Sequence, residues 1–138
     1  SRNGSIINIS SIAGKRGSAN NSVYCASKFG VNGITQSLSK ELGKKKIRVN
    51  SVCPVYIKTK GLKNALKDKV SPTNGKKIDS YLEKFIKQNS SLQNLPSSED
   101  VANFCYFLSS DKAKSITGQC LNIDSGVFPQ WKNKKLLQ

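Results

Sequence analysis

Apolar and polar positions in the first part of the chain follow the pattern of a strand, a helix and a second strand. Residues 4–10 (GSIINIS) form an apolar, β-branched run, which predicts a strand buried on both faces. From 22 to 42 apolar residues recur at helical spacing and Gly43 follows, which predicts a helix with a C-cap glycine. Residues 46–55 are again rich in β-branched side chains and predict a strand. This order predicts a right-handed, parallel βαβ unit.

The middle of the chain is more polar and less regular. Residues 57–95 are rich in Lys, Ser and Asn, and they carry only weak helical patterns around 61–69 and 78–88. Weak periodicity combined with high polarity is typical of loops and of short surface helices. We therefore expect a mobile insertion here rather than a linker between two domains.

The last part of the chain predicts one more helix and one more strand. Ser97 or Ser98 is a suitable helix cap, because acidic residues follow it in the first turn, next to the positive end of the helix dipole. The buried stripe of this helix is expected at Val101, Phe104, Cys105 and Leu108. Residues 120–123 form a third apolar run, which predicts a third strand.

Composition favours a single folded domain. Hydrophobic residues make up 36% of the 138 residues and are clustered, which is not typical of a disordered chain. No run approaches the roughly 18 apolar residues that a membrane-spanning helix needs. No secretory signal opens the chain. We therefore expect a soluble, cytoplasmic protein.

The cysteines are predicted to be free thiols rather than metal ligands. They are far apart in the sequence, no CxxC pair occurs, and the chain has no His to complete a mixed zinc site. Disulfide pairing is the weaker alternative, because no secretory signal is present. The residues concerned are Cys25, Cys53, Cys105 and Cys120.

A net charge of +15 raises the alternative of a nucleic-acid-binding module, because Lys and Arg neutralise phosphates. Only Arg2, Arg16 and Arg48 are arginines, although the bidentate guanidinium is the usual reader of phosphates and bases. The lysines are spread over several segments that read as loop, helix and tail. This spread favours a solvated surface over a nucleic-acid interface.

Tyr24 and Lys28 are the strongest candidates for chemistry. They stand four positions apart in the predicted helix, so their side chains share one face. A cationic ammonium close to a phenol stabilises the phenolate and helps the hydroxyl to exchange a proton near neutral pH. Ser11 follows the first strand, and ligands of parallel α/β sheets bind beyond the carboxyl ends of strands. Ser11 could donate a hydrogen bond to a substrate carbonyl oxygen beside Tyr24.

Four motifs stand in an order and spacing that we find in one family. The sequence resembles the C-terminal, catalytic half of the short-chain dehydrogenase/reductase family, and the resemblance runs from Gly4 to Phe128. The motifs are GSIINISSIAG (4–14), YCASK (24–28), IRVNSVCPVYIKT (47–59) and SSEDVANFCYFLSSDKAKSITGQCLNIDSG (97–126).

The resemblance implies an NAD- or NADP-dependent enzyme that interconverts a carbonyl and a secondary alcohol by hydride transfer. It implies that Ser11 polarises the carbonyl, that Tyr24 is the general acid or base, and that Lys28 favours ionisation of Tyr24 and holds the nicotinamide ribose. Ser11 is preferred over Ser10 because it aligns with the active serine of the family. The expected cofactor-binding residues are Tyr24, Lys28, Pro54, Val55, Ile57 and Thr59.

The resemblance also implies a fold and a mode of assembly. We expect an α/β fold, the C-terminal part of a Rossmann-like, doubly wound parallel sheet, with three strands and flanking helices. Residues 1–128 would form this partial domain, with 57–95 as a substrate lid and 129–138 as a tail. The helix at 22–43 would form a homodimer or homotetramer contact. The substrate would be a small molecule, and neither a membrane nor a nucleic acid is expected as a partner.

Two departures from the family pattern affect these expectations. Val55 stands where the family usually has Gly close to the cofactor, so its side chain could crowd the nicotinamide. The glycine-rich phosphate turn, the residue that selects NAD or NADP and a catalytic Asn precede Ser1 in a complete member. We therefore expect the chain alone to be inactive, with an unpaired strand edge at 6–9. A non-catalytic interaction module is a further alternative.

Overall fold

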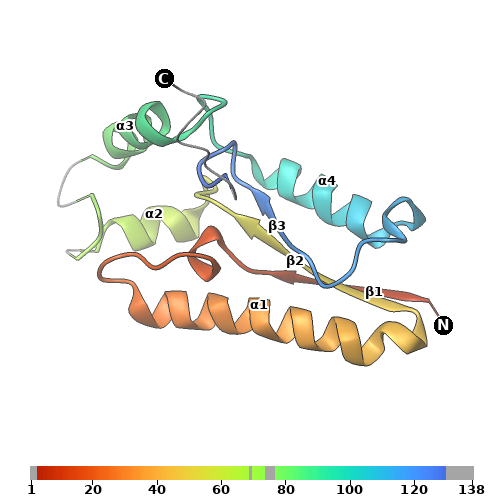
Figure 1. Cartoon of the computed structure of the whole chain (residues 1–138). Helices are drawn as coiled ribbons and strands as arrows, with labels where there is room; N and C mark the ends of the chain where they lie inside the picture. The colour runs from red at the N-terminus through yellow and green to blue at the C-terminus, as the bar shows by residue number, and fades with distance from the viewer. Residues whose placement is uncertain (1–2, 69, 74–76, 130–138) are drawn as a thin grey trace, which may run out of the picture.

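The computed structural model describes residues 3–68, 70–73 and 77–129. Apart from Pro129, the predicted tail at 129–138 lies outside the described residues. The elements are, in order, β1 (Gly4–Ile9), η1 (Ile12–Gly14), α1 (Ser22–Leu42), η2 (Gly43–Lys45), β2 (Ile47–Pro54), α2 (Lys60–Leu66), α3 (Ile78–Asn89), α4 (Ser98–Ser109), η3 (Asp111–Ala113) and β3 (Cys120–Ile123). Figure 1 shows their arrangement.

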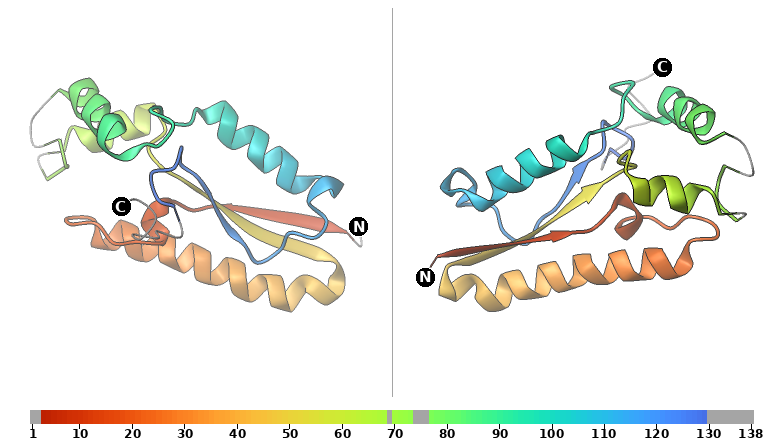
Figure 2. Two further views of the ribbon diagram at one scale, coloured as in Figure 1. Left: turned by 45° about the horizontal axis from the view of Figure 1, so that its top comes forward. Right: turned by 180° about the vertical axis from the view of Figure 1, so that it is seen from behind.

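The strands form one parallel sheet in the order β1-β2-β3, so the predicted parallel α/β architecture is confirmed for the described residues. Pairing of β1 with β2 runs from Gly4 opposite Ile47 to Ile9 opposite Val52. Helix α1 covers one face of the sheet and α4 covers the other (Figure 2). The two helices α2 and α3 lie within 57–95, near the segments where the weak patterns predicted helices.

The face toward α4 holds the apolar core. Val52, Leu108 and Ala113 are buried at its centre. The partly buried side chains around them are Ile7, Val101, Phe104, Cys105, Ile116, Leu121 and Ile123. The predicted stripe of α4 therefore lies in this core, with Leu108 at its centre. The predicted cap of α4 is Ser97, which forms a capping box with Asp100. The expected placement of this helix is therefore confirmed.

The face toward α1 is packed differently from what the apolar stripe of that helix indicates. Asn32, Thr35 and Ser39 are the side chains of α1 that are buried with Cys25, whereas Ile34 is 56% exposed. These polar side chains are buried at low cost because they are hydrogen-bonded. Asn8 Nδ2 donates to Thr35 Oγ1 at 2.9 Å. Within the expected apolar stripe, Ala26, Gly30 and Ile34 are exposed, whereas Val31, Leu38 and Leu42 are partly buried.

The end of α1 also differs from the prediction. Gly43 has right-handed helical angles (φ −57°, ψ −42°) and continues into η2, so it is not a left-handed C-cap. The left-handed residue is Lys46, with φ +59°, and it begins the turn into β2. The helix bounds at 22–42 are nevertheless as predicted.

The outer edge of β1 is uncovered. Ile6 is 38% exposed and Ile9 is 50% exposed, although both belong to a strand that the sequence marks as buried on both faces. Because β1 is also an edge strand in the order β1-β2-β3, the expected open edge at 6–9 is confirmed for the described residues. All four cysteines are free thiols, with Cys25 and Cys53 buried. Among the described residues, no helix is long and apolar enough to cross a membrane.

Candidate active site

The carboxyl ends of β1 and β2 lead into the segments that carry the predicted site residues. Strand β1 runs into η1, which begins after Ser11, and β2 runs through Pro54 toward α2. Helix α1, which carries Tyr24 and Lys28, packs against η1. Figure 1 shows η1, α2 and α3 gathered at this end of the sheet. Ligand sites of parallel α/β sheets occur at such carboxyl ends.

Ser10 and Ser11 have different surroundings. Ser10 is 4% exposed, and its Oγ donates to the carbonyl oxygen of Lys28 at 3.1 Å. Ser11 is only partly buried. Its Oγ accepts from Ala13 N at 3.1 Å and lies 3.5 Å from the carbonyl oxygen of Pro54. The Ser10 hydroxyl is therefore hydrogen-bonded to α1, whereas the Ser11 hydroxyl is partly exposed at the carboxyl end of β1.

Tyr24 and Lys28 lie close together on α1. Lys28 Nζ is 5.7 Å from the centroid of the Tyr24 ring. The same ammonium donates to the carbonyl oxygen of Ile9, the last residue of β1, at 3.1 Å. The cation is thus held between the phenol ring and the end of the strand. An ammonium within about 6 Å of an aromatic ring is attracted to its face.

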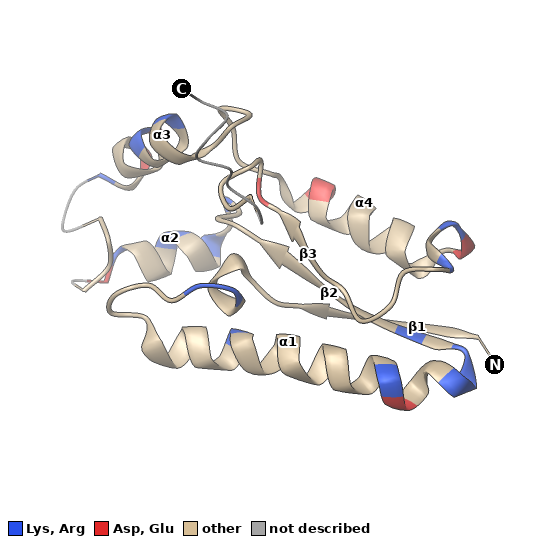
Figure 3. Cartoon of the chain, viewed as in Figure 1, with Lys and Arg blue, Asp and Glu red and all other residues tan. Residues whose placement is uncertain are grey.

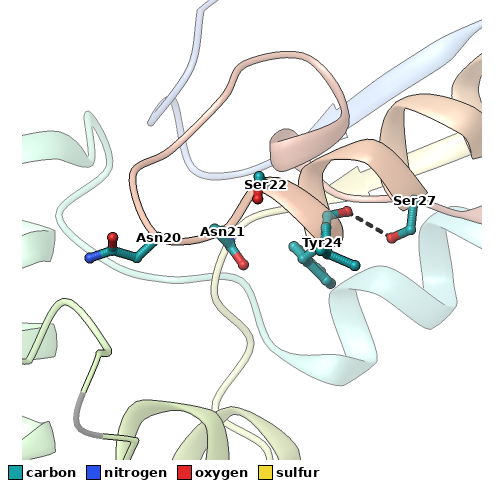
Figure 4. A pocket seen from close by; sticks show the side chains of 6 residues that line it. Asn20, Asn21, Ser22, Tyr24 and Ser27 are labelled. Carbon is teal, nitrogen blue, oxygen red and sulfur yellow. Dashed lines mark hydrogen bonds between the residues drawn. The ribbon is translucent and has the colours of Figure 1, made fainter.

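The Tyr24 hydroxyl is open to a ligand. Tyr24 is 45% exposed, and its hydroxyl has no hydrogen bond to any other described residue. It lines a shallow depression of about 510 Å³ at the start of α1, shown in Figure 4. Ser27 Oγ donates to the backbone carbonyl of Tyr24 at 2.7 Å and leaves the phenol unengaged. The remaining lining residues are Asn20, Asn21, Ser22 and Val23.

A close backbone approach holds η1 against α1. A Cβ added at Gly14 would lie 2.6 Å from the carbonyl oxygen of Lys28 and 2.8 Å from Ser10 Oγ. Asn32 Nδ2 donates to the carbonyl oxygen of Gly14 at 2.9 Å, and Ser51 Oγ donates to Asn32 Oδ1 at 2.9 Å. These contacts connect β2, α1 and η1. They fix the turn after Ser11 relative to the helix that carries Tyr24.

The segment after β2 places the other predicted residues. Val55 is 8% exposed, and its N donates to the carbonyl oxygen of Ile123 at 3.4 Å, so its side chain packs within the protein. Thr59 Oγ1 caps α2 by accepting from Leu62 N at 3.2 Å. Within the described residues, the carbonyl oxygen of Pro54 lies 3.5 Å from Ser11 Oγ, whereas the Thr59 hydroxyl has no hydrogen bond to Ser11, Tyr24 or Lys28. The Ile57 side chain is aliphatic and is partly buried.

An aromatic cluster near this segment was not anticipated from the sequence. Tyr56 Oη lies 3.2 Å from Tyr81 Oη, and the Tyr56 ring packs against Phe85 with centroids 4.9 Å apart. Burial raises the pKa of Tyr56 well above its ordinary value, and the hydrogen bond to Tyr81 raises it further. The spacing of Tyr81, Leu82 and Phe85 on one face of α3 was the available signal. The contact between Arg16 and Phe128 was also not predicted. The Arg16 guanidinium lies 5.0 Å from the centroid of the Phe128 ring.

Basic residues are distributed over several elements. Figure 3 shows Lys and Arg at the end of α1 and in η2, on α2 and α3, and in the loops that flank η1 and η3. No single element carries them all. This distribution is that of a charged surface around the fold, in line with the spread of lysines along the sequence.

Comparison with known proteins shows the family to which this chain belongs. An oxidoreductase of the short-chain dehydrogenase/reductase family from Burkholderia thailandensis superposes with a TM-score of 0.77 and is 31% identical, covering 91% of this chain and 45% of that chain. A family model described as enoyl-(acyl carrier protein) reductase matches residues 1–128. The chain belongs to the short-chain dehydrogenase/reductase family.

Two further members of the short-chain dehydrogenase/reductase family illustrate the range of its relatives. The 3-oxoacyl-[acyl-carrier-protein] reductase FabG of Chlamydia muridarum is 38% identical over 129 residues, which cover 91% of this chain and 46% of that protein. The F189W actinorhodin polyketide ketoreductase, solved with NADPH, has a TM-score of 0.82 and 28% identity over 91% of this chain and 48% of that chain. The chain thus spans about half the length of the curated relatives it matches.

Proposed function

We propose that this chain forms the catalytic half of an NAD(P)-dependent oxidoreductase that interconverts a small-molecule carbonyl compound and a secondary alcohol. The observation that carries the proposal is the position of the Lys28 ammonium, held 3.1 Å from the carbonyl oxygen of Ile9 and beside the ring of Tyr24. A phenol with an adjacent cation at the carboxyl edge of a parallel sheet is suited to proton exchange with an alkoxide.

Each polar group has a role in the proton transfer of this proposal. The Tyr24 hydroxyl donates a proton to the substrate oxygen in reduction and accepts it in oxidation. Lys28 stabilises the phenolate left behind. The Ser11 hydroxyl donates a hydrogen bond to the same oxygen and stabilises its developing negative charge. The open Tyr24 hydroxyl and the partly exposed Ser11 support these assignments.

The residues present fit the nicotinamide end of NAD or NADP. When bound, the cofactor supplies or accepts the hydride. Tyr24 and Lys28 would hold its ribose, and the segment with Pro54, Val55, Ile57 and Thr59 would line the nicotinamide. The chemistry of the two side chains supports this fit, since a hydroxyl and an ammonium group are both suited to hydrogen bonds with the hydroxyl groups of a ribose.

The proposal extends to the organisation of the whole protein. Residues 1–128 form the partial catalytic domain, with 57–95 as the substrate lid. The α1 helix contributes to a homodimer or homotetramer, which is supported by its exposed apolar side chains. Val23 is 84% exposed, Phe29 48% and Ile34 56%. The open β1 edge is where the cofactor-binding half would pair.

A binding measurement tests the proposal. The isolated chain should show no change in NADH or NADPH fluorescence on titration, because its sequence contains no glycine-rich phosphate turn. A full-length polypeptide in which this chain is joined to a dinucleotide-binding half should bind at least one of the two cofactors and reduce a member of a panel of ketones, 3-oxoacyl thioesters and ketoses. A full-length protein that binds neither cofactor would contradict the proposal. Tight binding by the isolated chain would contradict the expected dependence on the missing half.

A further inference from the structure

Two tyrosines from distant parts of the sequence meet beside the candidate site. Tyr56 lies just after Pro54, whose carbonyl oxygen is 3.5 Å from Ser11 Oγ. Tyr81 lies on α3, and the two phenol oxygens are 3.2 Å apart. A short path through covalent bonds and hydrogen bonds therefore connects Ser11 to α3.

The rings around this hydrogen bond are packed in favourable orientations. Tyr56 and Tyr81 have centroids 6.3 Å apart with planes at 64°. Phe85 completes the cluster, with its centroid 4.9 Å from Tyr56 and 6.4 Å from Tyr81. Edge-on and tilted pairs at such distances are attractive beyond the apolar area they bury. Leu82, between the two α3 aromatics, is 2% exposed and anchors the same helix.

The other end of α3 is attached separately. Ser90 is 3% exposed, and its Oγ is 2.7 Å from the carbonyl oxygen of Asn94 and 3.2 Å from that of Ser125. Leu92 N donates to the carbonyl oxygen of Ser125 at 3.2 Å. The helix is therefore tied at its C-terminal end to the loop after β3. The tyrosine pair is its polar link to the loop after β2.

We propose that Tyr56 and Tyr81 form a clasp that holds α3 over the carboxyl edge of the sheet and positions the segment that contacts Ser11. The inference rests on the proposed function, and it assigns the pair to substrate positioning rather than to proton transfer. Neither hydroxyl has a hydrogen bond to Ser11, Tyr24 or Lys28 within the described part of the chain. The clasp acts through the backbone at Pro54 and through the placement of α3.

The chemistry of the pair suits a permanent clasp. Burial and the partner hydroxyl keep the pKa of Tyr56 far above neutral. The Tyr56 hydroxyl therefore stays protonated over the physiological range and can keep its hydrogen bond to Tyr81. Loss of either hydroxyl leaves the other partly buried without this partner, and leaving a desolvated hydroxyl unpaired destabilises the protein.

The test compares Tyr56→Phe, Tyr81→Phe and the double variant in the full-length polypeptide, with Tyr106→Phe as the control because Tyr106 is 78% exposed on α4. Each single variant should raise KM for the carbonyl substrate about five-fold, as expected for one lost hydrogen bond, with kcat nearly unchanged. The double variant should be no worse than either single variant, because both remove the same interaction. Additive effects, or KM values equal to that of the control, would overturn the clasp.

A second readout does not depend on activity. In a spectrophotometric pH titration of the tyrosines, Tyr81→Phe should let the most resistant phenol ionise at a lower pH than in the wild type. Tyr106→Phe should remove one phenol and leave the resistant one unchanged. If the full-length protein shows no turnover but the resistant phenol responds as described, the proposed function fails, and with it the role in substrate positioning, while the structural link between Tyr56 and Tyr81 stands. If turnover is present and neither KM nor the titration responds, the clasp alone fails.

Discussion

The side-chain ammonium of Lys28 donates a 3.1 Å hydrogen bond to the carbonyl oxygen of Ile9. This bond joins the middle of α1 to the last residue of β1. Ser10 Oγ donates in the opposite direction, to the carbonyl oxygen of Lys28 at 3.1 Å. The lysine is thus fixed at both its backbone and its head. Its charge is held at the mouth of the sheet, beside the Tyr24 ring.

Removing the charge of Lys28 should affect both binding and turnover. Lys28→Met keeps a long side chain but loses the ammonium. In the full-length protein we expect kcat to fall by about 100-fold or more, because the phenolate of Tyr24 is no longer stabilised. We also expect weaker NAD(P)H affinity, because the ribose loses a partner. Steady-state kinetics and fluorescence titration check both effects. An unchanged cofactor affinity would contradict the second role.

The two adjacent serines provide a matched pair. Each alanine variant should lose about 1 kcal/mol of unfolding free energy, because each hydroxyl makes hydrogen bonds within the fold. Only Ser11→Ala should lower kcat/KM strongly, by about 100-fold, as for loss of a donor to a developing oxyanion. Denaturant unfolding and kinetics of both variants check this. A larger catalytic loss in Ser10→Ala would reverse the assignment.

Gly14 should not tolerate a side chain. In Gly14→Ala the new Cβ would lie 2.6 Å from the carbonyl oxygen of Lys28, which is helix backbone that cannot yield easily. Overpacking of this kind costs about 1–3 kcal/mol. Gly17→Ala is the control, since no heavy atom lies within 4 Å of its added Cβ. Equal denaturation midpoints for the two variants would contradict the predicted close approach.

The cap of α4 should contribute a pH dependence in the acid range. Hydrogen bonds from Ser97 N and Oγ, both at 2.7 Å, hold the pKa of Asp100 below its ordinary value. The stabilisation is therefore present above the ordinary pKa, about 3.9, and is lost as pH falls through the lower folded value. Asp100→Asn should unfold with a smaller acid-range slope than the wild type. An acid-range slope in Asp100→Asn equal to that of the wild type would contradict this contribution of the cap.

Local chemistry explains what the sequence could predict of the fold. The β-branched runs of β1 and β2 and the Ser97 cap act within a few residues, so the strands, α1 and α4 were found near their observed bounds. Tyr24 and Lys28 could also be predicted as candidate residues, because their i, i+4 spacing in a helix places them on one face.

Features that depend on long-range packing were not predictable in the same way. The apolar stripe of α1 indicated a buried face, yet the polar side chains of Asn32 and Thr35 are buried there and bind sheet side chains. Their burial depends on hydrogen-bond partners in other elements, which no local pattern reveals. The Tyr56–Tyr81 pair joins two segments of the polar insertion in the same way, and a sequence pattern shows neither their distance nor their burial.

Substitution of Tyr24 by Phe in the full-length protein tests the central claim most directly. The variant keeps the ring beside Lys28 and removes only the hydroxyl. The account predicts that kcat falls by about 100-fold to 10,000-fold, as for loss of a general acid, while the Kd for NAD(P)H stays nearly unchanged. Turnover close to that of the wild type would contradict the assignment of Tyr24 as the group that transfers the proton.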